Sequence, residues 1–313
     1  MKRILSLTLI LSLALTVSAQ HQIATLKHND SISVYYGGNA FVLAHAAAVE
    51  GDIITLSSGL FTPPDTLNKA ITIRGAGFTT DTLTGKEPTV INTLVRMRVP
   101  GNDQHHLKLE GIRFSDELRC RNTTSHAEFL RCYFKEIDYS NISGSSDSIT
   151  HSNFINCIIR EGSYIFNSNI VNCAVVSSSN NMKNNTFRNC AAYTSSSSYN
   201  LWQNCVLYNY GYPSQSSITC YNCIGIYSSS SSSNFFSSPV QNNCQNAGNA
   251  FSNIFKTFTY SSSSSELYVD ETFELIDSIA SIYLGSDGTQ VGMHGGLFPY
   301  SSRVGDQRIG RIT

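Results

Sequence analysis

The chain of 313 residues has 21 basic and 22 acidic side chains, a formal net charge of −1 and 41% hydrophobic residues. This balance gives no reason to expect nucleic acid or an anionic membrane as a partner. A chain of this length would ordinarily suggest about two domains, but a single repetitive solenoid can take up all of it.

The first residues have the features of a secretory signal peptide. Lys2 and Arg3 precede an apolar run over residues 4–15, and small residues at 17–19 form a cleavage site. The run is too short to cross a bilayer. We therefore expect a signal peptide over 1–19 that is cleaved near Ala19, a lead-in over 20–39, no membrane span, and a secreted, periplasmic or cell-surface location.

Short strands punctuated by glycine follow the lead-in. Residues 46–56 read Ala-Ala-Ala-Val-Glu-Gly-Asp-Ile-Ile-Thr-Leu, Gly59-Leu60-Phe61 comes next, and residues 70–77 read Ala-Ile-Thr-Ile-Arg-Gly-Ala-Gly. Glycine is favoured where the chain turns with a positive φ. The pattern indicates short strands separated by tight turns.

An Asn-Cys dipeptide then recurs at intervals of 15 to 21 residues. A large or apolar residue stands three positions before most of these cysteines, and another stands two positions after. The copies are Asn156-Cys157, Asn172-Cys173, Asn189-Cys190, Asn204-Cys205, Asn222-Cys223 and the degenerate Asn243-Cys244, with Phe154, Ile170, Phe187, Trp202 and Cys220 before and Ile159, Val175, Ala192 and Leu207 after. A repeat of this length is too short for a helical hairpin and fits one turn of a β-solenoid.

Stacking explains which residues recur. Coils about 4.8 Å apart place like residues above one another, so the Phe/Ile/Trp and Cys positions should form ladders inside the tube. Asn suits a turn because it tolerates the left-handed conformation, and stacked Asn amides can hydrogen-bond along the axis. Gly111 fits the Asn position, whereas Arg131 does not, so we expect the coil to open outward at Arg131.

These motifs resemble the right-handed parallel β-helix of the pectate-lyase-like superfamily, in secreted proteins of Bacteroidetes-type bacteria. The closing run at residues 285–296, Gly-Ser-Asp-Gly-Thr-Gln-Val-Gly-Met-His-Gly-Gly, is similar to the end of such proteins. The resemblance implies an all-β fold: a single-stranded right-handed parallel β-helix (β-solenoid) over 40–299, a short N-terminal capping helix near 41–49, and a C-terminal tail over 300–313.

Nine cysteines in an exported chain could form disulfides. Because most of them share one ladder position, we expect buried free thiols, although a bridge between adjacent coils is geometrically possible. Cys220 and Cys223 have a metal-like spacing, but no second ligand pair accompanies them. We expect neither a metal nor another cofactor.

Residues 189–255, which contain the last Asn-Cys repeats, have no Asp, Glu, Lys, Arg or His. The charged groups of the repeat region therefore lie in the coils before residue 189. Counting from the ladder positions places Lys135 near Arg160 and Glu136 near Glu161. A Lys/Arg pair beside two Glu resembles the chondroitinase-B-type polysaccharide lyases, which also use calcium, although their surrounding motifs do not occur here. The alternative is an exposed face of mixed charges that contribute little each.

Tyrosines offer a different interpretation. Tyr193 and Tyr208 share an outward position on adjacent coils, and Tyr210 and Tyr212 follow in the next loop. Stacked, exposed rings suit the apolar faces of sugars, although Tyr is also common in strands generally.

Two functions follow from these patterns. The first is a non-catalytic exported protein that presents a surface for a glycan or a partner, with Tyr193, Tyr208, Tyr210 and Tyr212 as glycan-binding residues. The alternative is a polysaccharide lyase for uronic-acid polymers, with Lys135, Glu136, Arg160 and Glu161 as catalytic candidates and calcium as its only cofactor. The oligomeric state does not follow from the sequence.

Overall fold

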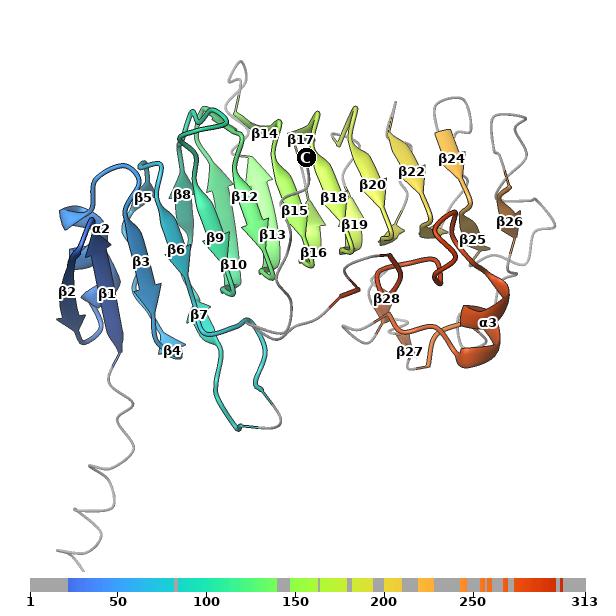
Figure 1. The fold of residues 1–313 in the computed structure, drawn as a ribbon, viewed down its shortest axis with the longest axis horizontal. Coiled ribbons are helices and arrows are strands. Elements are labelled where there is room, and N and C mark those ends of the chain that lie inside the picture. Colours follow the sequence, from blue (N-terminus) through green and yellow to red (C-terminus); the bar gives the residue numbers. More distant parts are fainter. Residues whose placement is uncertain are drawn as a thin grey trace, which may run out of the picture.

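The structure is a computed structural model, and it describes residues 22–81, 84–139, 147–162, 164–178, 182–193, 200–209, 219–227, 243–246, 254–256, 258–260, 267–269, 273–296 and 299–300. Within these ranges the chain is mostly β, with two helices, α2 (Ala40–Ala47) and α3 (Asp277–Ile282). Figure 1 shows the strands stacked side by side along one long axis, which confirms the predicted all-β parallel solenoid.

Two long sheets form the walls of the tube. Sheet A contains, in spatial order, β2 (Ser31–Tyr36), β1 (Ile23–His28), β3 (Ile53–Leu56), β6 (Thr72–Arg74), β9 (Lys108–Glu110), β12 (Glu128–Leu130), β15 (Asn153–Ile155), β18 (Asn169–Val171), β20 (Thr186–Arg188), β22 (Leu201–Gln203) and β24 (Thr219–Tyr221). Sheet B contains β26 (Gln245–Asn246), β25 (Ile224–Tyr227), β23 (Val206–Asn209), β21 (Ala191–Tyr193), β19 (Ala174–Ser178), β16 (Ile158–Gly162), β13 (Tyr133–Tyr139), β10 (Arg113–Cys120), β7 (Thr89–Ile91) and β4 (Gly59–Leu60), with β5 (Thr66–Leu67) and β8 (Val95–Met97) beside this path.

A third, short sheet contains β11 (Thr123–Ser125), β14 (Ser148–Thr150) and β17 (Ile165–Phe166). From β3 onward, pairing in the three sheets is parallel. Antiparallel pairs of named strands occur at the start, where β1 pairs with β2 and β3, and in the hairpin of β27 (Phe258–Tyr260) and β28 (Leu267–Val269). Each coil therefore contributes one strand to each long wall, as a repeat of 15 to 21 residues requires.

The register confirms the predicted interior ladders. Phe129, Phe154, Ile170, Phe187, Trp202 and Cys220 are successive partners in sheet A, and all are buried. Neighbouring rings stack face to face, with centroids 4.5 Å apart for Phe129 and Phe154 and 3.8 Å for Phe187 and Trp202. The cysteines that share the ladder position are buried free thiols, namely Cys132, Cys157, Cys173, Cys190, Cys205 and Cys223. Cys190 Sγ, for example, donates to the carbonyls of Ile170 and Arg188 at 3.1 and 3.2 Å.

The Asn of each repeat lies at a corner in the left-handed conformation, with φ between 50° and 58°. This confirms the role of Asn at the turn. Arg131 takes the same conformation with φ 49° and is only 4% exposed, so the expectation that its coil opens outward is wrong. An ion pair with Glu110 holds the Arg131 guanidinium against the wall.

A second polar ladder runs inside the tube and was not predicted. Its side chains accept a hydrogen bond from the backbone N–H of the preceding coil, at 3.1 Å from Ser152 N to Ser168 Oγ and 3.0 Å from Ser168 N to Asn185 Oδ1. Asn200 continues it, with its Oδ1 accepting from Asn185 N at 2.9 Å. Each member lies five residues before a ladder Cys, which is the signal that could have revealed it. These bonds satisfy backbone donors at a corner where strand pairing stops.

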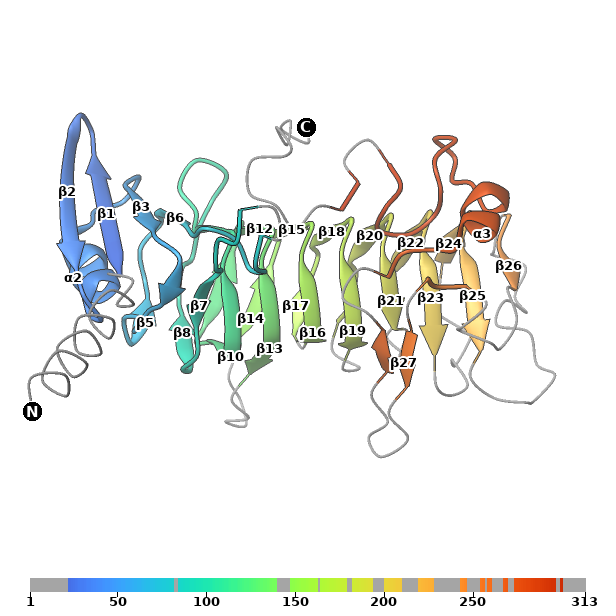
Figure 2. The ribbon, with the colours of Figure 1, turned by 90° about the horizontal axis from the view of Figure 1, so that it is seen from below.

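The C-terminal segment, by which we mean the described residues from 254 to 300, lies on the outer wall of the late coils (Figures 1 and 2). Its apolar side chains join outward-facing residues of sheet B in a second core, which contains Ile158, Ala174, Ala191, Val206, Ile224, Ile226, Ile254, Phe255, Phe273, Leu275, Val291 and Met293. The sequence contained the signal, because the residue directly after the Cys is apolar in every Asn-Cys copy except the degenerate one at Cys244. The segment covers the wall of the tube rather than adding a further parallel coil.

That segment also changes the expected role of the Asn amides. Asn172 Nδ2 donates to the carbonyls of Met293 and Gly295 at 3.0 and 2.7 Å, and Asn204 Oδ1 accepts from Ser286 N at 3.1 Å. A hydrogen bond between side-chain amides along the axis, as predicted, is formed where Asn243 Nδ2 donates to Asn222 Oδ1 at 2.8 Å. Asn172 and Asn204 thus hold the returning chain, whereas Asn222 and Asn243 bond to each other.

Helix α2 packs against β1, β2 and β3 at the start of the tube. Its last turn is closed by Lys69, whose Nζ donates to the carbonyls of His45, Ala46 and Ala48 at 2.6 to 3.0 Å. A cation at this end satisfies unpaired carbonyls and suits the negative end of the helix dipole. The helix is thus fixed to the first coils.

Candidate functional site

The predicted charged residues lie on two adjacent strands of sheet B, β13 and β16. Strands β13 and β16 pair Phe134 with Ile159 and Ile137 with Gly162, and the same offset of 25 residues places Lys135 beside Arg160 and Glu136 beside Glu161. Lys135 and Glu161 are exposed, and the other two are partly exposed. Among the described residues no group of three or more His, Cys, Asp or Glu is arranged to hold a metal ion.

The predicted tyrosine column is in register, because Tyr193 pairs with Tyr208 between β21 and β23. Their side chains lie outside the described part of the structure, as do Tyr210 and Tyr212 altogether. The next residue of the column, Ile226, pairs with Tyr208 and is fully buried in the second core. Glycan binding by these tyrosines stays a prediction.

A polar face that was not predicted runs across the outer side of sheet A. Its residues are successive partners from β9 to β20, namely Lys108, Glu128, Asn153, Asn169 and Thr186. Each is at least partly exposed. Lys108 Nζ lies 3.1 Å from Glu128 Oε2, and Asn169 Nδ2 donates to Asn153 Oδ1 at 3.0 Å. Charged and amide groups thus repeat at one-coil spacing, about 4.8 Å.

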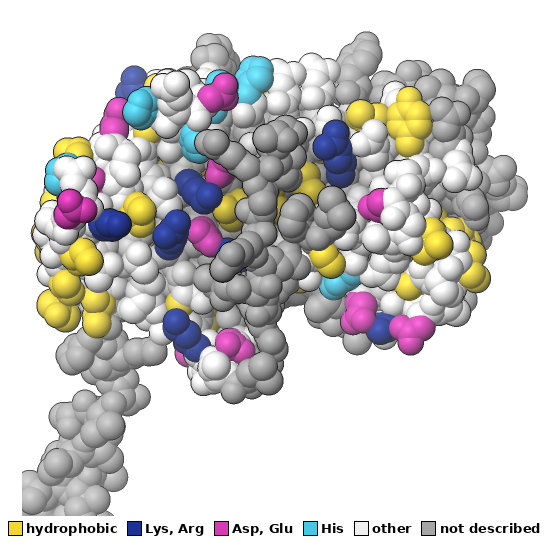
Figure 3. Space-filling view, viewed as in Figure 1, with side chains coloured by type: hydrophobic (Ala, Val, Ile, Leu, Met, Phe, Trp, Pro, Cys, Tyr) yellow, Lys and Arg dark blue, Asp and Glu magenta, His cyan; other side chains and the backbone are white. Residues whose placement is uncertain are grey.

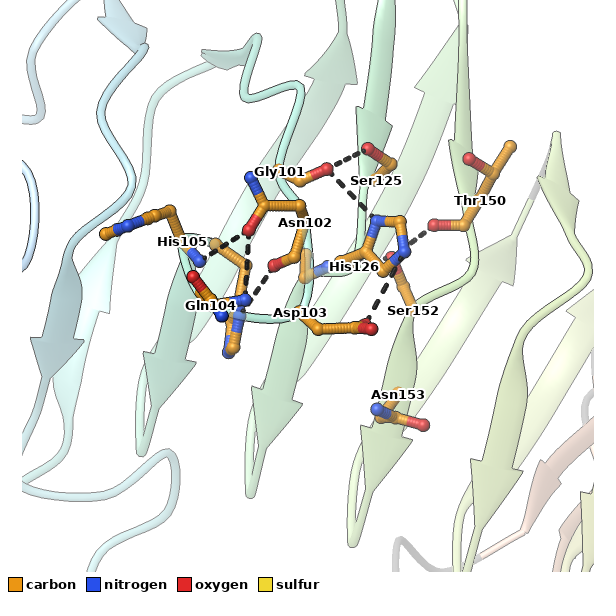
Figure 4. Close-up of polar contacts among 12 residues, drawn as sticks. Gly101, Asn102, Asp103, Gln104, His105, Ser125, His126, Thr150, Ser152 and Asn153 are labelled. Carbon is orange, nitrogen blue, oxygen red and sulfur yellow. Dashed lines mark hydrogen bonds and ion pairs between the residues drawn. The ribbon is translucent and has the colours of Figure 1, made fainter. Parts of the chain in front are cut away.

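Histidines line one edge of this face, at the corner between the third sheet and sheet A. The rings of His126 and His151 stack with centroids 5.6 Å apart, and both residues have the left-handed backbone that Asn167 adopts one coil later. Figure 4 shows His126 between the loop at Gly101–Asp103 and the strand ends at Thr150. In Figure 3, His and acidic side chains gather along this side of the molecule.

The imidazoles of His126 and His106, the latter in the loop before β9, are held in the same way. His126 Nδ1 lies 3.0 Å from the carbonyl of Gly101, and His106 Nδ1 lies 3.2 Å from that of Asn102. Their Nε2 atoms each face a carboxylate at 3.7 Å, Asp103 for His126 and Glu128 for His106. A carbonyl beside Nδ1 fixes the proton there, which leaves Nε2 as an acceptor in the neutral ring.

The polar face therefore offers imidazole nitrogens, carboxylates, amides and one ammonium group on a flat surface. Such a set hydrogen-bonds hydroxyl groups in both directions. The opposite charges of Lys108 and Glu128 largely cancel, so the face has no strong preference for a charged ligand. Sequence reasoning missed it, although His126, His151, Asn167 and Asn184 all stand six residues before a ladder Cys.

Comparison with known proteins finds no matching family profile, no matching curated protein and no matching solved structure. Within the described residues, neither helix has the length and apolar character needed to cross a membrane.

Proposed function

We propose that this chain is an exported right-handed parallel β-helix that binds a neutral glycan on the polar face of sheet A without cleaving it. The signal-like first 19 residues support export. A right-handed coil is the expected hand, because parallel strands of one sheet joined by a crossover are almost always connected that way. The position of α2 against the first strands supports its role as the cap of the tube.

The observation that carries this proposal is the in-register column of partly exposed polar side chains from Lys108 to Thr186. A glycan laid along the axis meets a new donor or acceptor at every coil. Its hydroxyls can accept from the amides of Asn153 and Asn169 and donate to the carboxylate of Glu128. A rigid β-wall holds these groups in place, so little side-chain ordering opposes binding.

Titration of neutral glycans by calorimetry tests this proposal. The double variant Glu128→Gln, Asn153→Ala should bind at least about ten-fold more weakly, and added salt should change the affinity little. The matched control is Thr219→Ala, which alters the same outward column on β24. Equal binding by all three proteins would reject the polar face, and loss only in Tyr193→Ala, Tyr208→Ala would assign binding to the tyrosine column.

A polysaccharide lyase is the second candidate, and the register of Lys135 with Arg160 favours it. A neutral Lys135 amine would take the proton next to a uronate carboxylate, while Arg160 would offset the negative charge that develops there. Elimination would then break the bond to the oxygen of the leaving sugar, which would take a proton from the protonated Lys135 or from water, and would leave a double bond conjugated with the carboxylate. The lyase proposal rests on these two basic residues, with Glu136 and Glu161 beside them.

The double bond makes this candidate easy to test. Acidic polysaccharides incubated with the protein, with and without added calcium, should gain ultraviolet absorbance, and Lys135→Ala should abolish the gain. Lys183→Ala serves as a control for loss of a different exposed lysine. An absence of absorbance across a panel of uronic-acid polymers would exclude the lyase and leave the binding function standing.

A further inference from the structure

Strand β2 forms the free edge of sheet A at the start of the tube. It pairs with β1 on one side, and no strand among the described residues pairs with its other side. Proteins usually protect such an edge with lysine, proline or a bulge, because its unpaired backbone groups can add a further strand. The six residues of β2, Ser-Ile-Ser-Val-Tyr-Tyr, include no charged side chain and no proline, and their register with β1 is continuous.

The backbone groups on this free edge belong to alternate residues of β2. Gly37 N donates to Gln22 O across the hairpin at 2.9 Å. Residues along an antiparallel strand alternate between those that hydrogen-bond to the neighbouring strand and those that do not. The amide and carbonyl groups of Ile32, Val34 and Tyr36 therefore point away from β1, toward the open side of the sheet.

Apolar side chains gather at the same end of the molecule (Figure 3). Tyr35 packs against the interior core, so its neighbours Val34 and Tyr36, together with Ile32, share the outward face of the strand. These three side chains are 66%, 44% and 67% exposed for Ile32, Val34 and Tyr36. Helix α2, which packs against β2, adds Leu43 at 51% exposed. Exposed apolar side chains beside unpaired backbone groups indicate an interaction surface.

A second copy of β2 fits this edge in one register. About a two-fold axis at Val34, antiparallel pairing sets Val34 opposite Val34 of the partner copy and Ile32 opposite its Tyr36. Opposed residues point to the same face, so the outward apolar side chains meet one another, and each of the three opposed pairs exchanges two hydrogen bonds. Asp30, the acidic residue of the hairpin turn, comes opposite Gly38 of the partner copy. No like charges therefore meet across the axis.

We propose that two copies of this protein form a symmetric dimer in which their β2 strands pair antiparallel and join the two A sheets. Every free backbone group of Ile32, Val34 and Tyr36 then has a partner. The same patch serves both copies, as a two-fold interface requires.

The dimer also bears on ligand binding. Lys27 of β1 pairs with Ile32 on one side and Ile53 on the other, and Ile53 leads through Thr72 to Lys108. The outward face of β2 and the polar face therefore lie on the same side of sheet A. A two-fold axis perpendicular to the joined sheet keeps both polar faces on that side. This consequence rests on the proposed glycan binding, and it would let one long glycan bind both copies.

Sedimentation velocity over a dilution series tests the dimer without any glycan, so its failure is separate from failure of the proposed function. The protein should sediment as a dimer that dissociates on dilution. Val34→Lys sets two ammonium groups opposite each other and should weaken dimerisation at least about ten-fold. The matched control is Leu284→Lys, because Leu284 is 47% exposed and lies away from β2. A monomer at the highest concentration, or equal dimerisation by the two variants, would overturn the proposal.

Cross-linking under a mild oxidant tests the register. Val34→Cys should form a disulfide-linked dimer, because opposed Cα atoms about 5.5 Å apart are within reach of a disulfide. Ile32→Cys alone should not, since its own copy lies four residues farther along the partner strand, whereas a mixture of Ile32→Cys and Tyr36→Cys should. The native cysteines contribute little background, because all but the partly exposed Cys244 are buried. Equal cross-linking of Val34→Cys and Ile32→Cys would reject the two-fold pairing.

Discussion

The early coils, at residues 72–162, and the late coils, at residues 189–246, share one interior but have different outer walls. Early coils carry ion pairs such as Lys108 with Glu128 and Arg74 with Glu110, and their outer face on sheet A is open. Late coils have no charged residue, and their sheet B wall lies beneath the C-terminal segment. The chain itself thus covers an apolar part of sheet B, while the outer face of sheet A stays exposed.

The largest expected loss of stability comes from removing a buried ring, and it should differ in extent between the interior of the tube and the second core. Phe154→Ala in the interior and Phe255→Ala in the second core each remove a fully buried ring, which costs about 3–5 kcal/mol. Phe154→Ala should lower the stability of the whole tube, whereas Phe255→Ala should expose mainly the C-terminal segment. Hydrogen exchange of the backbone amides distinguishes them. Uniform loss of protection in Phe255→Ala would mean that the second core is part of one cooperative unit.

Acid should weaken the start of the tube and spare the late coils. Burial, followed by the nearby Lys69, lowers the pKa of His45 from 6.5 to about 4. The folded state therefore resists protonation, and stability is lost as the pH falls from about 6.5 to about 4, by roughly 3 kcal/mol.

Chemical unfolding at pH 7 and pH 4.5 measures this loss, and His45→Leu should remove most of the difference. Hydrogen exchange at pH 4.5 should show lost protection at α2 and β3, with β22 and β23 little changed, because residues 189–255 contain no His or carboxylate. A pH dependence unaltered in His45→Leu would assign it to other groups.

The thiol ladder should be unreactive in the folded protein. Burial raises the pKa of Cys132, Cys157 and Cys205 well above the ordinary value, so little thiolate is present. The pKa of Cys244 rises to about 12, since the hydrogen bond with Cys220 lowers it but the bond with Cys223 and burial raise it more.

Alkylation followed by mass spectrometry should therefore modify Cys244 first, because it is the partly exposed one among nine cysteines. The other cysteines should react only after denaturation. Replacing one ladder thiol, Cys190→Ser, should cost about 1–2 kcal/mol by burying a hydroxyl in its place. Rapid native labelling of most cysteines would contradict the buried ladder.

The smallest expected effect concerns the open wall. Lys108→Ala breaks an ion pair whose two side chains are 29% and 30% exposed, so it should change the stability by less than about 1 kcal/mol. A larger loss in chemical unfolding would show that the charged wall is held as tightly as the covered one.

Spacing alone predicted much of this fold. The Asn-Cys repeat set the coil length, and the apolar positions around Cys157 and Cys173 identified the interior columns that the register confirms. The conformation of the corners also followed, because Asn156 and Gly111 are residue types that accept a positive φ. These features depend on neighbours within one coil and on the identical position of the next coil.

Contacts across coils and between distant segments required the tertiary structure. The sequence does not say that residues 285–296 return to bond Asn172 and Asn204, because such pairing depends on the path of the chain over the outer wall. Arg131 is buried because Glu110, from the preceding coil, neutralises it there. The histidine corner likewise forms only when a loop and two coils meet. Local repetition therefore determined the tube, and long-range packing decided which of its walls is covered and which can bind.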